Sequence, residues 1–468
     1  MSASKPSTPP RTHTGPSGGR PARPPLGHRF LVFWFGQTVS TIGSTVSGVG
    51  VAVWVYLETG NATWLGLLTA LTALPAVLTS PLLPLVDRLP RRRVIVGADT
   101  LAAVGICIAL AMSIAGRLEV WHLAVAGFVA SLGTALQYPA FQAAIPSLVV
   151  PDALGRANGL NQLGPALGIV IGPLVATPLV AWYGITAVLV VDVATFVVAM
   201  ACTLAVRFDE RRETPAADDD GSWRPALRWL ASDGRPLLVL LVAMATTNFF
   251  LAFFNVAMIG LAASVLGAAR SGLVFAVGGV AMLVGSLVLG RRGVPDRRGR
   301  GLALGLGGVA VGCAVLAARP APVVVLLGAA CVLAVVPLVS SIVATVYHER
   351  VPSTMQGRVF GVRAAVGRAL DPIGAALSGV VITRIAEPAM IDGGWGADSV
   401  GRLIGTGVER AAALVLVGVA LAMATVAWWV RRSVGDSLDR STMPVSASTS
   451  EVDDIVDDLA GEVAPVRA

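Results

Sequence analysis

The sequence predicts an all-α membrane protein whose twelve transmembrane helices form two pseudo-symmetric six-helix halves. Of its 468 residues, 55% are hydrophobic and only 13% are charged, which is more apolar surface than a water-soluble domain can bury. The apolar residues fall into about twelve runs, and two short polar motifs recur about 200 residues apart. Together these observations predict a polytopic membrane protein built from a repeated unit.

The predicted spans follow from the length of each apolar run. About 20 residues of helix are needed to cross the ~30 Å hydrocarbon core of a bilayer. By this measure the spans cover residues 30–57, 62–86, 94–115, 119–142, 158–181, 184–206, 237–260, 270–290, 301–318, 321–347, 359–385 and 408–430. The first run is too long for the core of a signal peptide and lacks a small-residue cleavage site, so we expect it to be retained.

Arginine placement sets the predicted orientation. Arginines are concentrated in the N-terminal tail and in the loops after spans two, six and eight, and they are sparse in the alternating loops. Because basic loops stay in the cytoplasm, we expect both termini there, which agrees with an even number of spans. The predicted location is therefore the cell membrane, with the chain crossing it many times.

Composition divides the chain into five segments. Residues 1–29 are basic and rich in Pro, Gly and Ser, which predicts a disordered cytoplasmic tail. Residues 30–206 and 237–430 are the two six-helix halves, and residues 207–236 are a cytoplasmic loop between them. Residues 431–468 include an acidic stretch and are predicted to be a second disordered cytoplasmic tail.

Two motif pairs relate the halves to each other. Gly155-Arg156-x-x-Gly159 precedes the fifth span, and Gly357-Arg358-x-x-Gly361 precedes the eleventh. Asp87-Arg88 with Arg91 follows the second span, and Asp296-Arg297-Arg298-Gly299-Arg300 follows the eighth. Equivalent positions in successive halves are what parallel repeats in a transporter predict.

These charged motifs are candidates for a cytoplasmic gate. Arginines and carboxylates between helix ends can form charge-assisted pairs in one state and lose them in another. The alternative is that the arginines only hold the loops in the cytoplasm. The predicted gate residues are Asp87, Arg88, Arg91, Asp99, Arg156, Asp296, Arg297, Arg300 and Arg358.

The chain resembles the major facilitator superfamily from residue 30 to about residue 430. The family's loop Gly-x-x-x-Asp-Arg-x-Gly-Arg-Arg is matched in part by Asp87-Arg88-Leu89-Pro90-Arg91-Arg92, with Leu83 and Pro90 in place of its glycines. FWFGQTVSTIGSTVS, YPAFQAAIPSLVVPDALGRANGLNQ and QGRVFGVRAAVG are similar to the branch that exports drugs and siderophores, including macrolides and enterobactin. The resemblance implies the twelve-helix facilitator fold and export. Span four has no arginine, unlike many proton-coupled drug antiporters of other branches, so their proton route is not implied.

Charged residues inside the spans are the sharpest functional signal, because each costs at least about 2.5 kcal/mol in hydrocarbon unless it is paired or hydrated. Asp192 lies well inside span six, and Arg368 and Asp371 lie within span eleven at a spacing that allows them to pair. Pro372 follows them and leaves the Arg368 carbonyl without its helical donor. We predict Asp192 as the first candidate for proton coupling, with a structural hydrogen-bonded role as the alternative; Asp371 and Arg368 are the second.

Polar residues on the spans are candidates for a substrate cavity. A polar stripe on a membrane helix requires a wet cavity or a helix partner. Aromatic rings mixed with amides suit an amphipathic substrate, although bonding between helices is an equally good account of the asparagines. The candidates are Gln37, Thr41, Gln137, Asn161, Asn248, Asn255 and Phe253.

Span five has a row of small residues followed by a proline. Gly164, Gly168 and Gly172 repeat at four-residue steps, which brings a neighbouring helix close. Pro173 predicts a kink. The Gly-Pro pair is similar to a signature of the superfamily's antiporters, and ordinary helix packing is the alternative for the glycines.

Several chemistries are excluded. Lys5 is the only lysine, so the chain has no lysine for a Walker A phosphate loop. The four histidines and four cysteines are scattered without metal-ligand spacing, and neither GxSxG nor HExxH occurs. We therefore expect no enzymatic activity, no cofactor and no bound metal, and we read the basic charge as a topology signal and not as a nucleic-acid surface.

The combined prediction is a monomeric secondary transporter that exports an amphipathic small molecule in exchange for protons by alternating access. Its expected partners are the substrate, protons and the lipid bilayer. Export comes from the resemblance alone. An uptake permease of the same fold and a non-transporting receptor or partner subunit are the alternatives.

Overall fold

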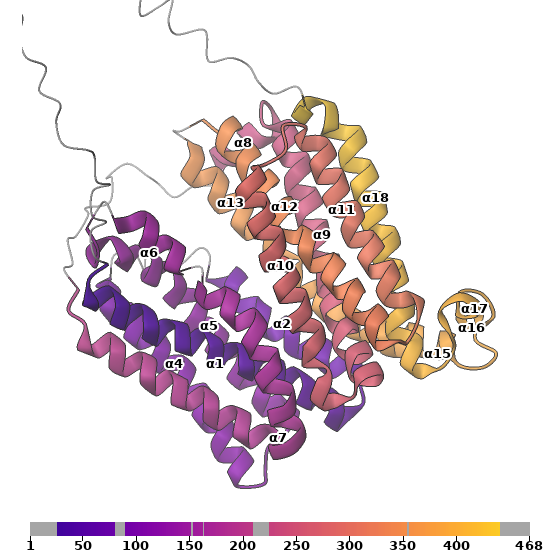
Figure 1. The fold of residues 1–468 in the computed structure, drawn as a ribbon, viewed down its shortest axis with the longest axis horizontal. Helices are drawn as coiled ribbons and strands as arrows, with labels where there is room; N and C mark the ends of the chain where they lie inside the picture. The colour runs from indigo at the N-terminus through magenta and orange to yellow at the C-terminus, as the bar shows by residue number, and fades with distance from the viewer. Residues whose placement is uncertain are drawn as a thin grey trace, which may run out of the picture.

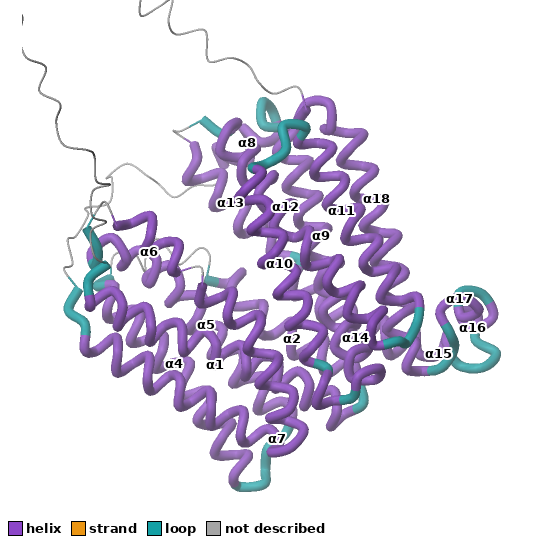
Figure 2. The backbone as a smooth tube through the Cα atoms, in the orientation of Figure 1, coloured by secondary structure: helices purple, strands orange, loops and turns teal. Residues whose placement is uncertain are grey.

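The computed structural model describes residues 26–79, 89–150, 153–161, 163–208, 224–352 and 355–439. Helices and short connections account for all of these residues (Figure 2). Two bundles, one from each half of the chain, lie side by side and diverge toward one face of the molecule (Figure 1). Some predicted features lie outside the described residues: Asp87, Arg88, the tails 1–25 and 440–468, and residues 209–223 of the central loop.

The first bundle contains one unusually long helix that folds back on itself. Its helices are α1 (His28–Thr59), α2 (Ala62–Leu78), α4 (Arg91–Ile114), α5 (Val120–Ala144), α6 (Leu154–Asn161) and α7 (Leu163–Ala205). Within α7, Gly184 has φ 74° and ψ −176°, a conformation that residues with a side chain rarely adopt. The bend at Gly184 separates α7 into two arms that correspond to predicted spans five and six.

The second bundle has long helices and one interrupted span. Its helices are α9 (Arg235–Leu266), α10 (Gly272–Arg292), α11 (Arg298–Ala318), α12 (Pro322–Arg350), α13 (Gln356–Ala369), α14 (Asp371–Val381) and α18 (Ala411–Asp439), preceded by α8 (Arg224–Ala231). A π-helix, η6 (Ile382–Ala386), extends α14 and leads into the short helices α15 (Glu387–Met390), α16 (Trp395–Asp398) and α17 (Gly401–Ile404). Short turns η2 (Ile145–Ser147), η4 (Ala268–Arg270) and η7 (Val408–Arg410) complete the described elements.

The helices agree with the predicted spans. Ten helical segments in the described residues are long and apolar enough to cross a bilayer. One of them, α7, contains two predicted spans, and the shorter α2 has 17 residues. Together they are consistent with the twelve predicted spans, and they confirm the all-α membrane fold.

Two boundaries differ from the prediction. Span eleven is not one continuous helix, because α13 ends at Ala369 and α14 begins at Asp371, next to Pro372. The last helix does not end near residue 430. Instead, α18 continues to Asp439, so the start of the predicted disordered tail is helical.

Small residues let α1 pack closely between the two arms of α7. A Cβ atom at Gly43 would overlap the side chain of Thr195, and one at Gly50 would lie 2.8 Å from Cγ1 of Val188. On the other arm, a Cβ at Gly172 would lie 2.6 Å from Cγ2 of Thr45. These short separations require glycine, and they fix the polar face of α1 against α7.

The two halves join near one face. We call this the loop face; it carries the turn between α1 and α2, the bend of α7 and the helices α15–α17. The opposite tail face carries the start of α1, α8 and the end of α18, and the bundles diverge toward it (Figure 1).

Specific hydrogen bonds from the start of α2 to α14 and η6, and from α7 to η4, hold the loop-face junction. The Thr63 hydroxyl donates to the carbonyl of Gly379 at 3.4 Å, and the Thr383 hydroxyl donates to Oδ1 of Asn61 at 3.2 Å. Between α7 and η4, the Thr177 hydroxyl lies 3.1 Å from the carbonyl of Ala269. The structure is therefore closed between the halves at the loop face.

Candidate functional site

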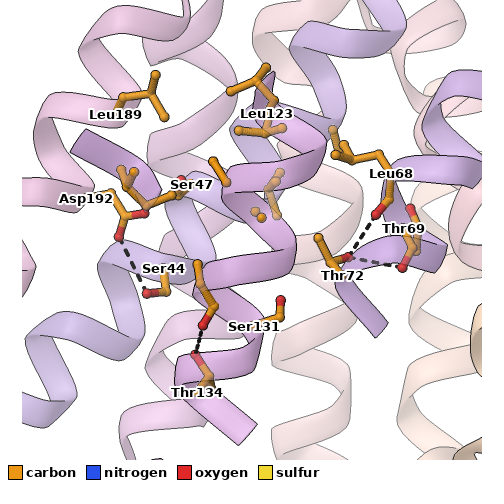
Figure 3. Close-up of a pocket in the computed structure, with 18 of the residues that line it drawn as sticks. Ser44, Ser47, Leu68, Thr69, Thr72, Leu123, Ser131, Thr134, Leu189 and Asp192 are labelled. Atoms are coloured by element: carbon orange, nitrogen blue, oxygen red, sulfur yellow. Dashed lines mark hydrogen bonds between the residues drawn. The ribbon is translucent and has the colours of Figure 1, made fainter. Parts of the chain in front are cut away.

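A cavity of about 310 Å³ lies mainly within the first half (Figure 3). Its walls come from α1, α2, α4, α5 and the second arm of α7. The second half contributes Asn255 and Ile259 from α9 and Phe275 from α10. Because both halves line it, a movement of one half against the other would change the shape of this cavity.

Asp192 is the charged residue of the cavity. It is the only charged residue on the second arm of α7, and its side chain is 2% exposed. The hydroxyl of Ser44 lies 3.5 Å from its Oδ1, and Ser47 lines the cavity beside it (Figure 3). Among the described residues, no basic side chain forms an ion pair with Asp192. Its carboxyl group is therefore held by neutral hydroxyl groups in an apolar wall.

Hydroxyl groups supply the remaining polar surface of the cavity. Thr69 and Thr72 on α2 and Thr134 on α5 donate their hydroxyl protons to carbonyls of their own helices, at 2.8–3.1 Å. Such local bonds leave the hydroxyl oxygen as an acceptor. With the carboxyl group of Asp192, the cavity therefore offers mainly acceptors, which suit a ligand that carries hydrogen-bond donors or a positive charge.

The structure places the predicted cavity residues in several different locations. Asn255 lines the cavity. Asn161 donates to Oε1 of Gln142 at 2.8 Å, and Asn248 donates to the carbonyl of Gly367 at 2.7 Å. Phe253 is 7% exposed and packs against the rings of two neighbouring phenylalanines on α9. A direct role of these residues in substrate binding stays a prediction.

Three further candidates belong to a different cluster. Gln37 and Gln137 both donate to the carboxyl group of Asp99, at 3.3 and 3.1 Å. Thr41 donates to the carbonyl of Gln37 at 2.8 Å. Asp99 itself was predicted as a gate residue, but it is 3% exposed and lies between helices of the first half.

Sequence reasoning missed much of the cavity wall. Thr69, Thr72, Ser131 and Thr134 line it, as does Phe275. Serine and threonine are common in membrane helices, so their presence gives little signal. The predicted residues Asp192 and Asn255 do line the cavity, as does Ser44, which lies seven residues or about two turns from Gln37 on α1.

The pair predicted in span eleven lies in the second half. Nε of Arg368 and Oδ2 of Asp371 are 3.6 Å apart, across the break between α13 and α14. The arginine side chain is 69% exposed and the aspartate side chain 24%. Pro372 occupies the first turn of α14, as the expected interruption of the helix requires.

The described gate candidates lie near the tail face. Arg91 donates to the carbonyl of Ala143, and Arg300 lies 4.0 Å from Asp439 on α18. Asp296 and Arg297 are exposed beside the start of α11. Arg156 and Arg358 each take part in an interaction in this region. A gating role for these residues stays a prediction.

The glycine row of the first α7 arm faces α1. Gly164 lies against Thr38, while Gly168 and Gly172 lie against Thr45. The following Pro173 lies on the other side of the arm, where its carbonyl is close to Gly272 of α10. The first arm of α7 thus contacts α1, which lines the cavity, and α10 of the second half.

Comparison with known proteins agrees with this architecture. The chain is 24% identical over 367 residues to macrolide efflux protein A of Streptococcus pyogenes, covering 76% of this chain and 90% of that protein. It is 28% identical over 398 residues to the enterobactin exporter EntS of Salmonella typhimurium strain LT2, covering 80% and 91%.

Solved structures share the fold. A mutant of the nucleoside transporter NupG matches with a TM-score of 0.68 at 13% identity, covering 87% of this chain and 100% of that one. An inward-facing bacterial homologue of the human lysosomal transporter Spinster matches with a TM-score of 0.67 at 15% identity, covering 91% and 100%. The family model described as Major Facilitator Superfamily matches residues 33–375. The chain therefore belongs to the Major Facilitator Superfamily of membrane transporters.

Proposed function

We propose that this transporter exports a cationic amphipathic small molecule in exchange for protons, with Asp192 as the coupling residue. The observation that carries the proposal is one buried carboxyl group, without a basic partner among the described residues, in a cavity that both halves line. Burial in a low dielectric disfavours the charged form of such a group, so it exchanges a proton or a cationic ligand readily. Binding of one would displace the other.

The cavity supports this class of substrate. Its volume of about 310 Å³ lies at the lower end of the range of about 300–1,000 Å³ for drug-sized ligands. Apolar side chains such as Leu68, Ile106 and Leu123 cover most of its wall, and the hydroxyl oxygens and Asp192 provide the acceptors. A neutral or anionic siderophore would find fewer complementary groups there than an amine.

The direction of transport is supported by the relatives, which are named as a macrolide efflux protein and an enterobactin exporter. The structure is closed at the loop face, and the arginine distribution assigns the tail face to the cytoplasm. In this orientation the described conformation is the one that takes up substrate from the cytoplasm. Labelling of tags at both termini from one side of intact cells tests the orientation.

Everted membrane vesicles test the function. We expect vesicles that contain the protein to accumulate ethidium or a macrolide when their interior is made acidic, and to release it when an ionophore removes the pH difference. An uptake permease would lose the probe under the same gradient. Cells that lack the gene should also be more sensitive to the accumulated compound. Accumulation that ignores the pH difference would contradict proton antiport.

A further inference from the structure

A second buried carboxyl group lies in the first half, outside the cavity wall. Asp99 on α4 is 3% exposed. The side-chain amide of Gln137 on α5 donates to its Oδ1 at 3.1 Å, and that of Gln37 on α1 donates to its Oδ2 at 3.3 Å. The Gln37 amide also lies 3.1 Å from the hydroxyl of Thr203 on α7. Four helices therefore enclose Asp99 with neutral partners.

The two amides also contact each other. Nε2 of Gln137 is hydrogen-bonded to Oε1 of Gln37. Gln37 is 5% exposed and Thr203 is fully buried, whereas Gln137 is partly exposed at the edge of the cluster. Every polar atom of such a cluster has to find its partner inside the protein.

The charged groups of the surrounding helices are directed elsewhere. On α4, Arg91 and Arg92 donate to the carbonyls of Ala143 and Leu204, and Arg93 is exposed. On α7, Asp192 is eleven residues from Thr203, or about 16 Å along the helix. The other titratable groups on these four helices are His28, Arg29, Tyr56, Glu58, Cys107, His122, Tyr138, Tyr183 and Cys202, and Arg207 follows the end of α7. Within the described residues, none of these groups forms an ion pair with Asp99.

A buried carboxylate without a cation is costly in its charged form, whereas its protonated form needs an acceptor for one O–H group. Gln37 and Gln137 can satisfy both forms. With their NH₂ groups toward Asp99 they stabilise the carboxylate, and rotation of one amide would present its oxygen to the protonated acid. The cluster is thus built to hold Asp99 in either state without a basic residue.

We propose that Asp99 is a second proton-binding site, separate from the substrate cavity. One proton adds to the carboxylate from water at the tail face and leaves to water again, and no other bond changes. Because Asp99 does not line the cavity, a substrate cannot displace this proton directly. Its release instead follows a change in the packing of α1, α4, α5 and α7. The transport role of the site rests on the proposed proton antiport, whereas proton binding itself does not.

The polar stripe of α1 connects this site to the cavity. Gln37, Thr41 and Ser44 lie at intervals of four and three residues, on one face of the helix. Gln37 contacts Asp99, Ser44 contacts Asp192, and Thr41 bonds to the carbonyl of Gln37 between them. A movement of α1 would therefore alter the partners of both carboxyl groups together.

Infrared titration of the full chain in liposomes tests the proposal. The carbonyl stretch of protonated carboxyl groups is followed as the pH is raised, without any substrate. We expect Asp99→Asn to remove one component of this band and Asp192→Asn to remove another, whereas Asp233→Asn, which changes an exposed carboxyl group, leaves both in place. A band that is identical in wild type and Asp99→Asn would overturn the proposal.

A second variant covers the case in which Asp99→Asn does not fold. Asp99→Glu keeps the carboxyl group, so its component should persist at a shifted frequency; an unshifted band would overturn the proposal. The vesicle assay is independent of this result. If Asp99→Asn loses its component while wild-type transport is independent of the pH difference, the second proton site is retained and proton antiport is rejected. If the band is unchanged in Asp99→Asn while wild-type transport depends on the pH difference, proton antiport is retained and the second site is rejected.

Discussion

The two halves share a helical architecture but hold their membrane-embedded carboxyl groups in opposite ways. In the first half, Asp192 and Asp99 are almost completely buried and have only hydroxyl or amide partners among the described residues. In the second half, Asp371 is partly exposed and lies 3.6 Å from the guanidinium group of Arg368. A carboxyl group with neutral partners can take up a proton without breaking an ion pair, whereas protonation of Asp371 would break its pair with Arg368. The contrast supports the proposal that ion exchange takes place in the first half.

The tail face of the second half is also fixed by charges. Asp439 at the end of α18 accepts from the backbone N–H groups of Gly299 and Arg300, at 2.7 and 3.3 Å. Nη1 of Arg431 lies 3.0 Å from Oδ2, the other oxygen of the same carboxylate. The start of α11 is thereby capped by a carboxylate from another helix, which suits the helix dipole. These contacts join the end of α18 to the start of α11 at the tail face.

The largest effect should distinguish Asp192 from Asp371. We expect Asp192→Asn to lower the rate of pH-driven accumulation in everted vesicles by about 100-fold, or ~2.7 kcal/mol, because the exchangeable proton is lost. Asp371→Asn should lower it by less than about threefold, since an exposed ion pair is worth only about 0–1 kcal/mol. Equal losses in the two variants, or unaltered pH dependence in Asp192→Asn, would remove the distinction between the halves.

A smaller effect should come from the junction between the halves. A Cβ atom at Gly379 of α14 would lie 2.7 Å from Cα of Thr63 and would overlap the carbonyl of Ala62 on α2. We expect Gly379→Leu to separate the halves at the loop face and to destabilise the protein by about 2 kcal/mol, measured as thermal unfolding in detergent.

Gly307→Leu is the matched control for this junction. It makes the same substitution inside the long helix α11, where an added Cβ would meet nothing within 4 Å. Its unfolding temperature should stay close to that of the wild type. If both glycine variants unfold alike, the loop-face contacts do not join the halves as described.

The smallest effect concerns the cap in the second half. Asp439→Ala removes the acceptor for two backbone N–H groups at the start of α11, which should cost about 1 kcal/mol of stability. Asp439→Asn keeps a side-chain oxygen and should recover most of this loss. Chemical denaturation of the purified variants measures both. A full loss with asparagine would mean that charge pairing with Arg431, and not capping, is responsible.

The fold could be predicted from the sequence because its main signals are local. A run such as residues 94–115 is long enough to span a bilayer whatever surrounds it, and it forms α4 over Arg91–Ile114. The repeated Gly-Arg and Asp-Arg motifs likewise predicted two related halves. The extension of α18 to Asp439 could not be predicted in this way, because its polar end is stabilised by contacts with α11 and not by its own hydropathy.

The candidate site was predictable only in part. Asp192 stood out because a lone charge in an apolar run has few structural explanations. Gln37 and Ser44 belong to the same polar stripe of α1, yet one contacts Asp99 and the other contacts Asp192. Nothing in that stretch of sequence distinguishes them, since the difference arises from the helices that pack against each turn.

By itself, the sequence determined the membrane-spanning segments, the duplication and the buried charges, because hydrophobic length and the cost of a charge in hydrocarbon act along a single helix. The tertiary structure decided which polar groups meet. It placed the hydroxyls of α2 and α5 around the cavity and two glutamines around Asp99. Such partnerships depend on the rotation and spacing of neighbouring helices, which a one-dimensional pattern does not specify.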